Sequence, residues 1–261
     1  MLRQHPDLRP VHLTSNKYAG RHLREVFPDL DGAFDLGFSK HDDPIPEGAA
    51  VFLATPNDTS MAMAPGLHSA GRMVVDLSGA FRLHDQDIFE KYYNLRHHSF
   101  DEMEHVAFGM PEILREKIRG SRFVSNPGCY ATAATIPLYL LGEDRKRLRS
   151  VIIDAKSGVS GAGGRTEDSG FIYHSVNENF RAYKILKHQH QPEIEEYAAT
   201  GLEGPPPYSM VFTPHLLPLF RGILSTMVLV WEDEAPGGLS DRMRAACETE
   251  PFLRFREAPE E

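Results

Sequence analysis

Ser125-Asn126-Pro127-Gly128-Cys129-Tyr130-Ala131-Thr132 is the stretch that decides the fold of this chain. An apolar run at 122–125 predicts a buried strand that ends where the stretch begins. Pro127 and Gly128 predict a tight turn, and the apolar residues of 131–141 predict a buried helix after it. A short buried strand that runs through a turn into a helix is typical of an α/β fold with a parallel sheet.

Other apolar runs fit the same architecture. Three short runs before this stretch predict buried strands that end in polar or glycine-rich turns, at 11–13, 49–54 and 73–77. The elements predicted after it are a strand, a helix and a long strand, at 150–155, 191–199 and 224–231. Because the pattern changes after the first helix, we predict two domains, residues 1–126 and residues 127–261.

Composition bounds the class of protein. The chain has 261 residues, of which 41% are hydrophobic and 25% charged, as in globular proteins. Its formal net charge of −9 argues against a nucleic-acid partner, which would require a basic surface. Two cysteines, Cys129 and Cys247, are too few for a disulfide framework, so a reducing cytoplasm is expected. Since no apolar run approaches the roughly 18 residues of a membrane span, we predict no membrane partner.

Cys129 is the first candidate for chemistry. The predicted turn places it at the start of a helix, where the dipole and the free N–H groups favour a thiolate. The same N–H groups can hold a developing oxyanion. The alternative is a buried free cysteine that packs as a small hydrophobic residue. The strand, turn and helix around Cys129 favour the nucleophile.

A thiolate nucleophile needs an acid/base partner. His188 and His190 stand two residues apart before a predicted helix, a spacing that points both side chains the same way in an extended segment. The alternative is a pair of surface histidines. No third ligand is evident nearby, so we predict no metal site.

Two further segments are candidates for binding anions. The glycine-rich segment 157–164 follows a predicted strand, and its successive N–H groups could form an anion-binding nest. The alternative is a flexible surface loop. Arg82 follows the strand at 73–77 at the carboxyl edge of the sheet, where it could clamp a carboxylate or a phosphate. The alternative for Arg82 is a solvated surface side chain.

The cofactor is predicted from the loop after the strand at 11–13. NAD enzymes commonly place an acidic residue there to bind the ribose 2′-hydroxyl. Here Thr14, Ser15 and Lys17 supply hydroxyls and a positive charge instead, which suits a 2′-phosphate and indicates NADP. Residues 158–164 do not have the G-x-G-x-x-G spacing of a dinucleotide-binding turn, and no such turn precedes Val11.

Several motifs together resemble the N-acetyl-γ-glutamyl-phosphate reductases, and they occur in that family's order. The motifs lie at 76–83, 125–132, 156–164, 176–180, 188–194 and 214–223. The resemblance implies a Rossmann-type NADP domain in residues 1–126. It implies an α+β catalytic and oligomerisation domain in residues 127–261, shared with aspartate-semialdehyde dehydrogenases. It also implies a homo-oligomer, a dimer or a tetramer, in the cytoplasm.

The resemblance also implies a mechanism in arginine biosynthesis. Cys129 attacks the γ-acyl phosphate as nucleophile and phosphate leaves, giving a thioester that NADPH reduces to the semialdehyde. His190 is the implied acid/base and His188 supports it. Cofactor contacts are expected from Thr14, Ser15, Lys17, Thr55, Pro56, Ser78, Ser157 and Gly158. Substrate contacts are expected from Arg82, Asn126 and Gly161.

The chain departs from the family pattern in four places. It starts after the family's first strand and G-x-x-G-x-x-G turn, and the family continues beyond Glu261, so we expect a chain truncated at both ends that binds NADP(H) poorly. Gln189 replaces a frequent arginine, and Gly164-Arg165 adds a glycine. Alternative functions are an aminoadipate-phosphate reductase of lysine biosynthesis, a non-catalytic binding module and a cysteine hydrolase.

Overall fold

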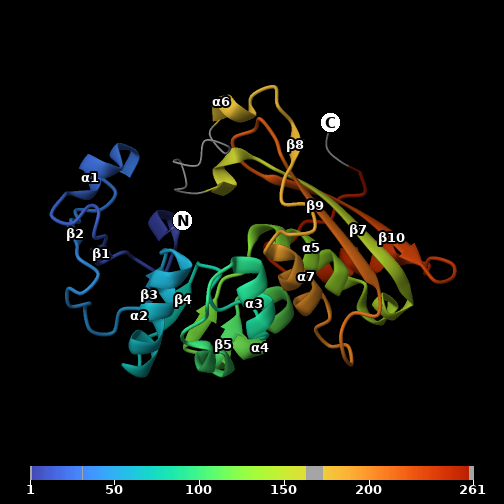
Figure 1. Cartoon of the computed structure of the whole chain (residues 1–261), viewed down its shortest axis with the longest axis horizontal. Coiled ribbons are helices and arrows are strands. Elements are labelled where there is room, and N and C mark those ends of the chain that lie inside the picture. Colours follow the sequence, from blue (N-terminus) through green and yellow to red (C-terminus); the bar gives the residue numbers. More distant parts are fainter. Residues whose placement is uncertain (1, 31, 163–172, 259–261) are drawn as a thin grey trace.

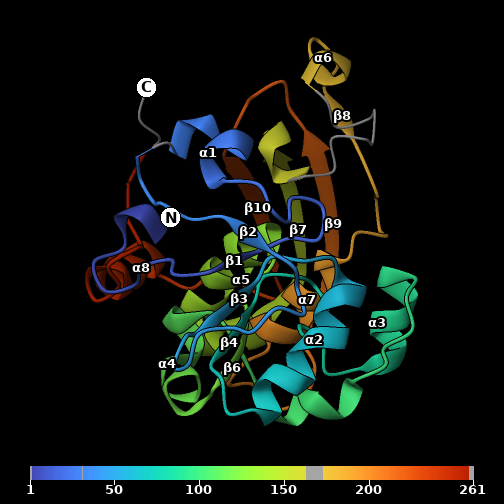
Figure 2. The ribbon, with the colours of Figure 1, turned by 90° about the vertical axis from the view of Figure 1, so that its left-hand side faces the viewer.

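The structure is a computed structural model that describes residues 2–30, 32–162 and 173–258. Two four-stranded sheets dominate it, with helices α5 (Cys129–Leu140) and α7 (His190–Ala198) between them (Figure 1, Figure 2). Short 3-10 segments in this part of the chain connect the elements, and they include Leu2–Gln4, Pro28–Leu30, Phe100–His105, Gly142–Arg147 and Val159–Ala162. No helix of the described residues is long and apolar enough to cross a membrane.

The first large sheet is parallel throughout, as the sequence predicts. Its strand order is β3-β4-β6-β5, and its members are β3 (Val51–Leu53), β4 (Val74–Asp76), β5 (Val106–Phe108) and β6 (Phe123–Ser125). The helices that follow these strands are α2 (Asn57–Ser69), α3 (Gln86–Tyr93) and α4 (Pro111–Gly120). Because the strands run the same way, their carboxyl ends meet at one edge, where ligands of open α/β sheets bind.

The predicted strands at 49–54, 73–77 and 122–125 are confirmed as β3, β4 and β6. Their inward side chains join helix residues in a core whose largest fully buried members include Met61, Phe81, Phe89 and Phe123. Ser125, the last residue of β6, is completely buried, and the chain leaves the sheet directly after it.

The strand predicted at 11–13 differs from expectation. Among the described residues, strand β1 (Leu13–Thr14) pairs only with β2 (Phe38–Ser39), in a separate two-stranded parallel sheet beside helix α1 (Leu23–Val26). Val11 lies outside β1 and is 56% exposed, so the prediction of a buried strand there was wrong. The apolar run at 11–13 gains little burial because β1 has one neighbouring strand and no described layer covers Val11.

The second large sheet is mixed, with the strand order β10-β7-β9-β8. Its members are β7 (Leu148–Ser157), β8 (Arg181–Ala182), β9 (Ser209–Leu216) and β10 (Ile223–Trp231). Strands β7 and β9 are parallel, whereas β10 and β8 run antiparallel to their neighbours. The remaining helices of this half are the short α6 (Tyr173–Val176) and α8 (Leu239–Glu248).

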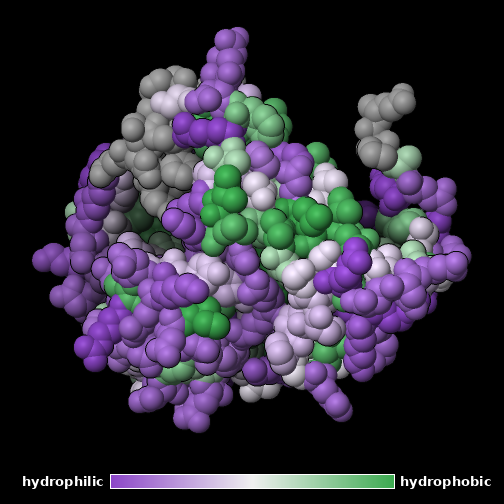
Figure 3. All heavy atoms as spheres, turned by 45° about the vertical axis from the view of Figure 1, so that its right-hand side comes forward, coloured by the Kyte–Doolittle hydropathy of each residue, from purple (hydrophilic) through white to green (hydrophobic). Residues whose placement is uncertain are grey.

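One face of this second sheet is covered and the other is open. Val151, Ile153 and Phe212 point inward and are fully buried in the core that α5 and α7 complete. Alternate residues point to the open face, where several large hydrophobic side chains are exposed: Ile152, Val211, Leu224 and Val228. They form a band of hydrophobic surface over β7, β9 and β10 (Figure 3).

Helix α5 connects the two halves of the chain. It begins at Cys129, two residues before the apolar run at 131–141 that predicts it, and Gly128 is its N-cap. Its side chains are apolar nearly all round, because Ala134 and Leu138 pack in the core of the second sheet while Ile136 packs against the first. The helix is therefore held on both sides, which fixes the position of Cys129.

Candidate active site

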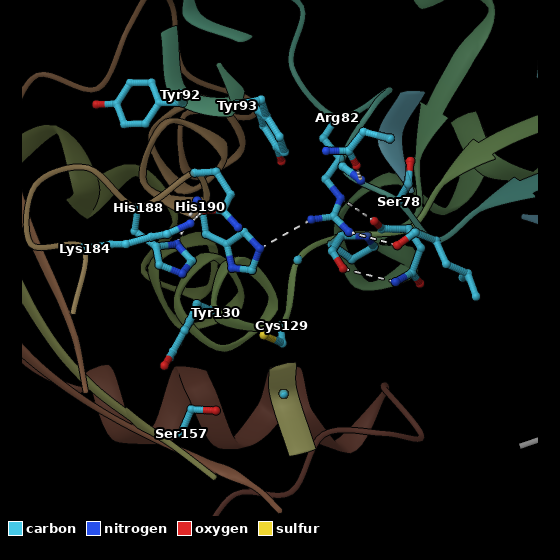
Figure 4. A pocket seen from close by; sticks show the side chains of 18 of the residues that line it. Ser78, Arg82, Tyr92, Tyr93, Cys129, Tyr130, Ser157, Lys184, His188 and His190 are labelled. Carbon is cyan, nitrogen blue, oxygen red and sulfur yellow. Dashed lines mark hydrogen bonds between the residues drawn. The ribbon is translucent and has the colours of Figure 1, made fainter. Parts of the chain in front are cut away.

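A cleft of about 920 Å³ opens at the carboxyl edge of the parallel sheet and reaches α5 and α7. It is lined by residues from both halves of the chain: Ala54, Thr55, Pro56, Asn57, Leu77, Ser78, Gly79, Arg82, Tyr92, Tyr93, Asn126, Pro127, Gly128, Cys129, Tyr130, Ser157, Gly158, Gly161, Tyr183, Lys184, His188, Gln189, His190 and Leu216. The candidate nucleophile and both candidate histidines thus share one cleft (Figure 4).

Cys129 is exposed in this cleft as the first residue of α5. The N-cap residue Gly128 has no side chain to satisfy the helix N–H groups, which leaves them to the cleft. Surrounding protein nevertheless raises the pKa of the Cys129 thiol, while the backbone N–H of Tyr130 and the charge of Arg82 act in the opposite direction. The expectation of a thiol favoured as thiolate was therefore wrong in its net direction, because desolvation outweighs the helix start.

His190 packs against the residue that precedes Cys129. A Cβ atom added to Gly128 would lie 2.4 Å from His190 Nε2, so only glycine leaves room for the ring. His190 is buried, and its Nε2 lies 3.4 Å from Arg82 Nη1. The ring is thereby held at the start of α5, within the cleft that exposes Cys129 (Figure 4).

His188 has a different set of contacts. Its Nδ1 accepts a hydrogen bond from the backbone N–H of His190 at 3.1 Å. Its ring packs edge-on against the rings of Tyr130 and Tyr183, with centroid distances of 5.3 and 5.6 Å. His188 thus helps to shape the segment that carries His190, whereas His190 Nε2 lies against Gly128, the residue before Cys129.

Glu193 is a functional candidate that the sequence reasoning missed. It is completely buried, and its Oε1 accepts a hydrogen bond from the Gly128 N–H at 2.6 Å. Its Oε2 lies 3.5 Å from Arg82 Nη1. Burial raises the pKa of Glu193, and the positive charge of Arg82 opposes this shift. A signal was present, since His190, Glu193, Ile194 and Tyr197 occur at helical spacing and share the buried face of α7.

Arg82 is buried, unlike the solvated arginine that was its alternative. Its Nε donates to the backbone oxygen of Asn126 at 2.8 Å, and its Nη2 donates to that of Leu77 at 3.3 Å. With the contacts to His190 and Glu193, the guanidinium joins the turn after β4 to the turn after β6 and to α7. These contacts engage Arg82 inside the protein, whereas the sequence analysis expected it to clamp substrate.

The turn after β4 is organised by a buried carboxylate. Asp76 accepts hydrogen bonds from the N–H and the hydroxyl of Ser78, and burial raises the pKa of Asp76 against these bonds. Gly79 follows, where a Cβ atom would lie 2.4 Å from the ring of Tyr93. The turn therefore brings Ser78 into the cleft and lets Tyr93 lie over the chain, and Tyr93 is another lining residue not predicted.

The glycine-rich loop differs from the predicted anion-binding nest. Four successive N–H groups, those of residues 158–161, donate to the backbone oxygens of Gly222, Leu219, Phe220 and Gly158. They are therefore used within the protein, and the prediction of a nest was wrong for these residues. A Cβ atom at Gly158 would lie 2.8 Å from Arg221 N, so this glycine permits close backbone packing. Gly163 and Gly164 lie outside the described residues.

The other expected contact residues divide into two groups. The cleft is lined by Thr55, Pro56, Ser78, Asn126, Ser157, Gly158 and Gly161. Thr14, Ser15 and Lys17 are not among its lining residues. Thr14 ends β1, where its Oγ1 lies 3.0 Å from His41 Nδ1, and Ser15 and Lys17 follow this strand. Among the described residues, no group of three or more His, Cys, Asp or Glu side chains could hold a metal ion.

This fold and site define an oxidoreductase class. Residues 1–121 match the family described as semialdehyde dehydrogenase, NAD binding domain, and residues 129–260 match semialdehyde dehydrogenase, dimerisation domain. Solved structures share the fold. Aspartate semialdehyde dehydrogenase with NADP from Candida albicans has a TM-score of 0.64 at 16% identity over 93% of this chain and 70% of its own. Aspartate semialdehyde dehydrogenase II from Vibrio cholerae has a TM-score of 0.62 at 14% identity over 92% of this chain and 71% of its own.

Curated relatives narrow the class. The chain is 51% identical to the N-acetyl-gamma-glutamyl-phosphate reductase of Leptospira interrogans serovar Lai over 96% of this chain and 74% of the relative. It is 41% identical to the reductase of the same name from Symbiobacterium thermophilum over 100% of this chain and 75% of the relative. The chain therefore belongs to the N-acetyl-gamma-glutamyl-phosphate reductase family, as its motifs predicted.

Proposed function

We propose that this protein reduces N-acetyl-glutamyl 5-phosphate to N-acetyl-glutamate 5-semialdehyde with NADPH, in arginine biosynthesis. One observation carries the proposal: Cys129 is exposed in a large cleft at the start of α5, and the His190 ring lies against the residue before it. A sulfur nucleophile with an acid/base neighbour is what acyl transfer requires. The names of the relatives supply the acyl phosphate as substrate.

The cleft fits a nicotinamide cofactor at the edge of the parallel sheet. The chain turns there from β3 into α2 through Thr55 and Pro56, and the N-cap Pro56 makes no side-chain hydrogen bond to the helix start. Such a helix start offers N–H donors to polar or anionic groups of a cofactor. Ser78, beside it, adds a polar lining residue. When bound, reduced NADP supplies the hydride that converts an acyl group to an aldehyde.

The chain's own residues carry the acyl transfer. His190 accepts the thiol proton as the Cys129 sulfur attacks the acyl carbon, so a carbon–sulfur bond forms. The carbon–oxygen bond to phosphate then breaks, and His190 returns the proton to the departing phosphate oxygen. The N–H groups at the start of α5 lie beside the sulfur and are suited to hold the carbonyl oxyanion.

Release restores the nucleophile. After reduction the carbon–sulfur bond breaks, the aldehyde leaves, and the Cys129 thiolate takes a proton from solvent through His190. His188 holds the His190 backbone through its Nδ1, and Glu193 holds the Gly128 N–H. These two residues fix the acid/base and the nucleophile's loop relative to each other.

The test compares the two cysteines in the acyl-phosphate reductase reaction. Cys129→Ser is expected to abolish NADPH oxidation, because a serine hydroxyl in this cleft has no comparable nucleophilicity. Cys247→Ser, in α8, is expected to keep near-wild-type activity. Equal loss of activity in the two variants, with both folded, would remove the proposal.

The oligomeric contact is proposed for the open face of the second sheet. That face lies within residues 129–260, which match a dimerisation domain. Val228, Ile152 and Val211 stand side by side across β10, β7 and β9 and are each at least 41% exposed. An exposed apolar band of this kind marks an association surface, so a second copy of the chain covers it in a dimer (Figure 3).

A further inference from the structure

The hydroxyl of Tyr93 is a polar group of the cleft that the proposed acyl transfer does not use. Tyr93 is the last residue of α3, and it lines the cleft. Its hydroxyl oxygen is enclosed by protein, and within the described residues it makes no hydrogen bond of ordinary geometry. A buried hydroxyl without a partner costs free energy, so a group of this kind at the wall of a cleft is expected to meet a ligand.

The ring of Tyr93 is fixed by its neighbours. It stacks on the ring of Phe89, one helical turn earlier, with a centroid distance of 4.6 Å and an interplanar angle of 16°. It also lies over Gly79, where an added Cβ atom would fall 2.5 Å from the Tyr93 hydroxyl oxygen. The Gly79 N–H donates to Asn57 Oδ1 at 2.8 Å, which holds this turn in place. The hydroxyl is therefore held at the turn after β4, at the carboxyl edge of the parallel sheet.

The groups around this hydroxyl leave its proton to a ligand. Arg82 is the cation beside it, and a guanidinium carries donors only, so Arg82 cannot accept that proton. The carboxylates of Glu193 and Asp76 act on Tyr93 through their charge, from beyond hydrogen-bond distance. Desolvation raises the pKa of Tyr93, and the charge of Arg82 opposes this shift. The phenol thus keeps its proton at neutral pH and can act as a hydrogen-bond donor.

The hydroxyl points to the part of the cleft where phosphate departs in the proposed reaction. Figure 4 shows Tyr93 pointing into the cleft between Arg82 and His190. His190, whose Nε2 lies 3.4 Å from Arg82 Nη1, is the proposed proton donor to the departing phosphate oxygen. The N–H groups at the start of α5 are suited to the carbonyl oxyanion instead. The phosphate is therefore expected on the side of His190, where the Tyr93 hydroxyl can reach it.

We propose that Tyr93 is a specificity-determining residue whose hydroxyl donates a hydrogen bond to a phosphate oxygen of the acyl phosphate. The proposal rests on the proposed function, since it takes the acyl phosphate as substrate. A hydrogen bond to an anionic oxygen is stronger than one to a neutral oxygen, so a phosphate is the partner that this hydroxyl favours. The described lining residues include no Asp or Glu that would repel the phosphate.

The test uses the reverse reaction, in which inorganic phosphate, the semialdehyde and NADP⁺ are varied separately. Tyr93→Phe removes the hydroxyl and keeps the ring that lies over Gly79. It is expected to raise the KM for phosphate by about tenfold to a hundredfold, the range of one lost hydrogen bond to a charged group. The KM values for the semialdehyde and for NADP⁺ should change less than about threefold. An unchanged KM for phosphate, or an equal or larger rise in either of the other two, overturns the proposal.

Tyr208→Phe is the matched control. Tyr208 is buried, and its hydroxyl also makes no hydrogen bond of ordinary geometry within the described residues. It packs in the core of the second sheet and is not among the described lining residues of the cleft. This variant is expected to keep all three KM values. An equal rise of the phosphate KM in both variants would show that the effect does not depend on a hydroxyl in the cleft, and it would overturn the proposal.

A measurement without turnover separates this inference from the proposed function. Calorimetric titration of inorganic phosphate into the wild type, Tyr93→Phe and Tyr208→Phe reads the binding of the anion alone. Weaker binding to Tyr93→Phe only supports the role of Tyr93, even where reduction of the acyl phosphate is not observed. Equal binding to the three proteins, or no binding to the wild type, contradicts that role.

Discussion

The imidazole of His190 lies so close to the backbone of Gly128 that a single added methyl group at Gly128 would fall 2.4 Å from Nε2. The φ of Gly128 is −68°, which any residue can adopt, so the requirement for glycine is one of space. Gly128 is also the N-cap of the helix that begins with Cys129. The proposed acid/base, His190, and the proposed nucleophile, Cys129, therefore both depend on the backbone at Gly128. We expect a change at Gly128 to lower activity more than it lowers stability.

Gly128→Ala is expected to lower kcat by about a hundredfold or more, because the ring of His190 must move and general acid/base catalysis contributes roughly 10²–10⁴-fold. Steady-state kinetics and circular dichroism measure the loss and the retained fold. The control is Gly66→Ala in α2, where an added Cβ meets nothing within 4 Å. That control is expected to keep its activity and to gain up to about 1 kcal/mol of stability. A wild-type kcat in Gly128→Ala would separate His190 from the chemistry.

The second prediction concerns the pH dependence of Cys129. Although Cys129 is exposed in the cleft, the surrounding protein desolvates its thiol and raises the pKa, so the native state holds the proton to higher pH than the unfolded chain. The rate of alkylation by iodoacetamide follows the thiolate, and its midpoint in the native protein should lie above the midpoint in urea. The same shift makes stability depend on pH. The contribution of Cys129 to the free energy of unfolding is fully present below the pKa of the thiol in the unfolded chain, and it is lost as pH rises through the pKa of the thiol in the native protein.

Two variants sharpen this measurement, both made in a Cys247→Ser background. Glu193 raises the pKa of the Cys129 thiol and Arg82 lowers it. Glu193→Gln should therefore move the alkylation midpoint down, and Arg82→Met should move it up. Shifts of the opposite sign, or a native midpoint below the one in urea, would show that desolvation does not govern this thiol.

The third prediction concerns the buried pair of Arg82 and Glu193. Each is enclosed by protein, so removing one partner leaves the other charge unpaired. Arg82→Met and Glu193→Gln are each expected to reduce the free energy of unfolding by about 3–5 kcal/mol. The double variant should lose less than the sum of the two. Urea denaturation of all four proteins completes the double-mutant cycle, and additive losses would show that the pair is not coupled.

The prediction of strands from the sequence succeeded at the apolar runs of β3, β4, β6, β7 and β10, whereas β5 and β9 were not predicted. The apolar runs of β4 and β6 stand out because each is closed by a polar turn residue. Strand β9 was missed because Ser209, Thr213, Pro214 and His215 interrupt its pattern. Its place in the sheet depends on pairing with β7, a contact between residues about sixty positions apart that no local pattern reveals.

In the candidate site, the sequence points to residues whose neighbours along the chain suggest a chemical role. It does not show which side chains pack against them from other elements. The sequence analysis proposed Cys129 from a turn and His190 from a paired motif, and both residues line the same cleft. Glu193 was passed over because a glutamate on a helix is most often solvated. Only the packing of α7 on α5 shows that this carboxylate meets the Gly128 N–H. The prediction of an anion-binding nest was wrong because backbone oxygens of residues 219–222 accept hydrogen bonds from the N–H groups of residues 158–160. Residues 219–222 lie far along the chain, so no local pattern shows this contact.

The fourth prediction tests the loop after β1. Lys17 and Ser15 carry the positive charge and hydroxyl that suit a 2′-phosphate, so replacing both with alanine should reduce the preference for NADPH over NADH. A fall of about tenfold in the ratio of the two kcat/KM values is expected for the loss of one charge-assisted contact. Lys40→Ala, on the neighbouring loop after β2, is the control and should leave the ratio unchanged. An unchanged ratio in the double variant would place the 2′-phosphate elsewhere.

The last prediction concerns the open face of the second sheet. Ile152 lies on β7, between Val228 on β10 and Val211 on β9, and is 42% exposed. A lysine there keeps its charge in solvent in the monomer but must lose water when a second copy covers the face. Ile152→Lys is therefore expected to raise the dimer Kd about a hundredfold or more, measured by sedimentation velocity. Ile88→Lys, on α3 and 37% exposed, is the control and should leave the Kd unchanged. An intact dimer in Ile152→Lys would move the contact to another surface, because an unpaired lysine cannot be buried at its centre without a large cost.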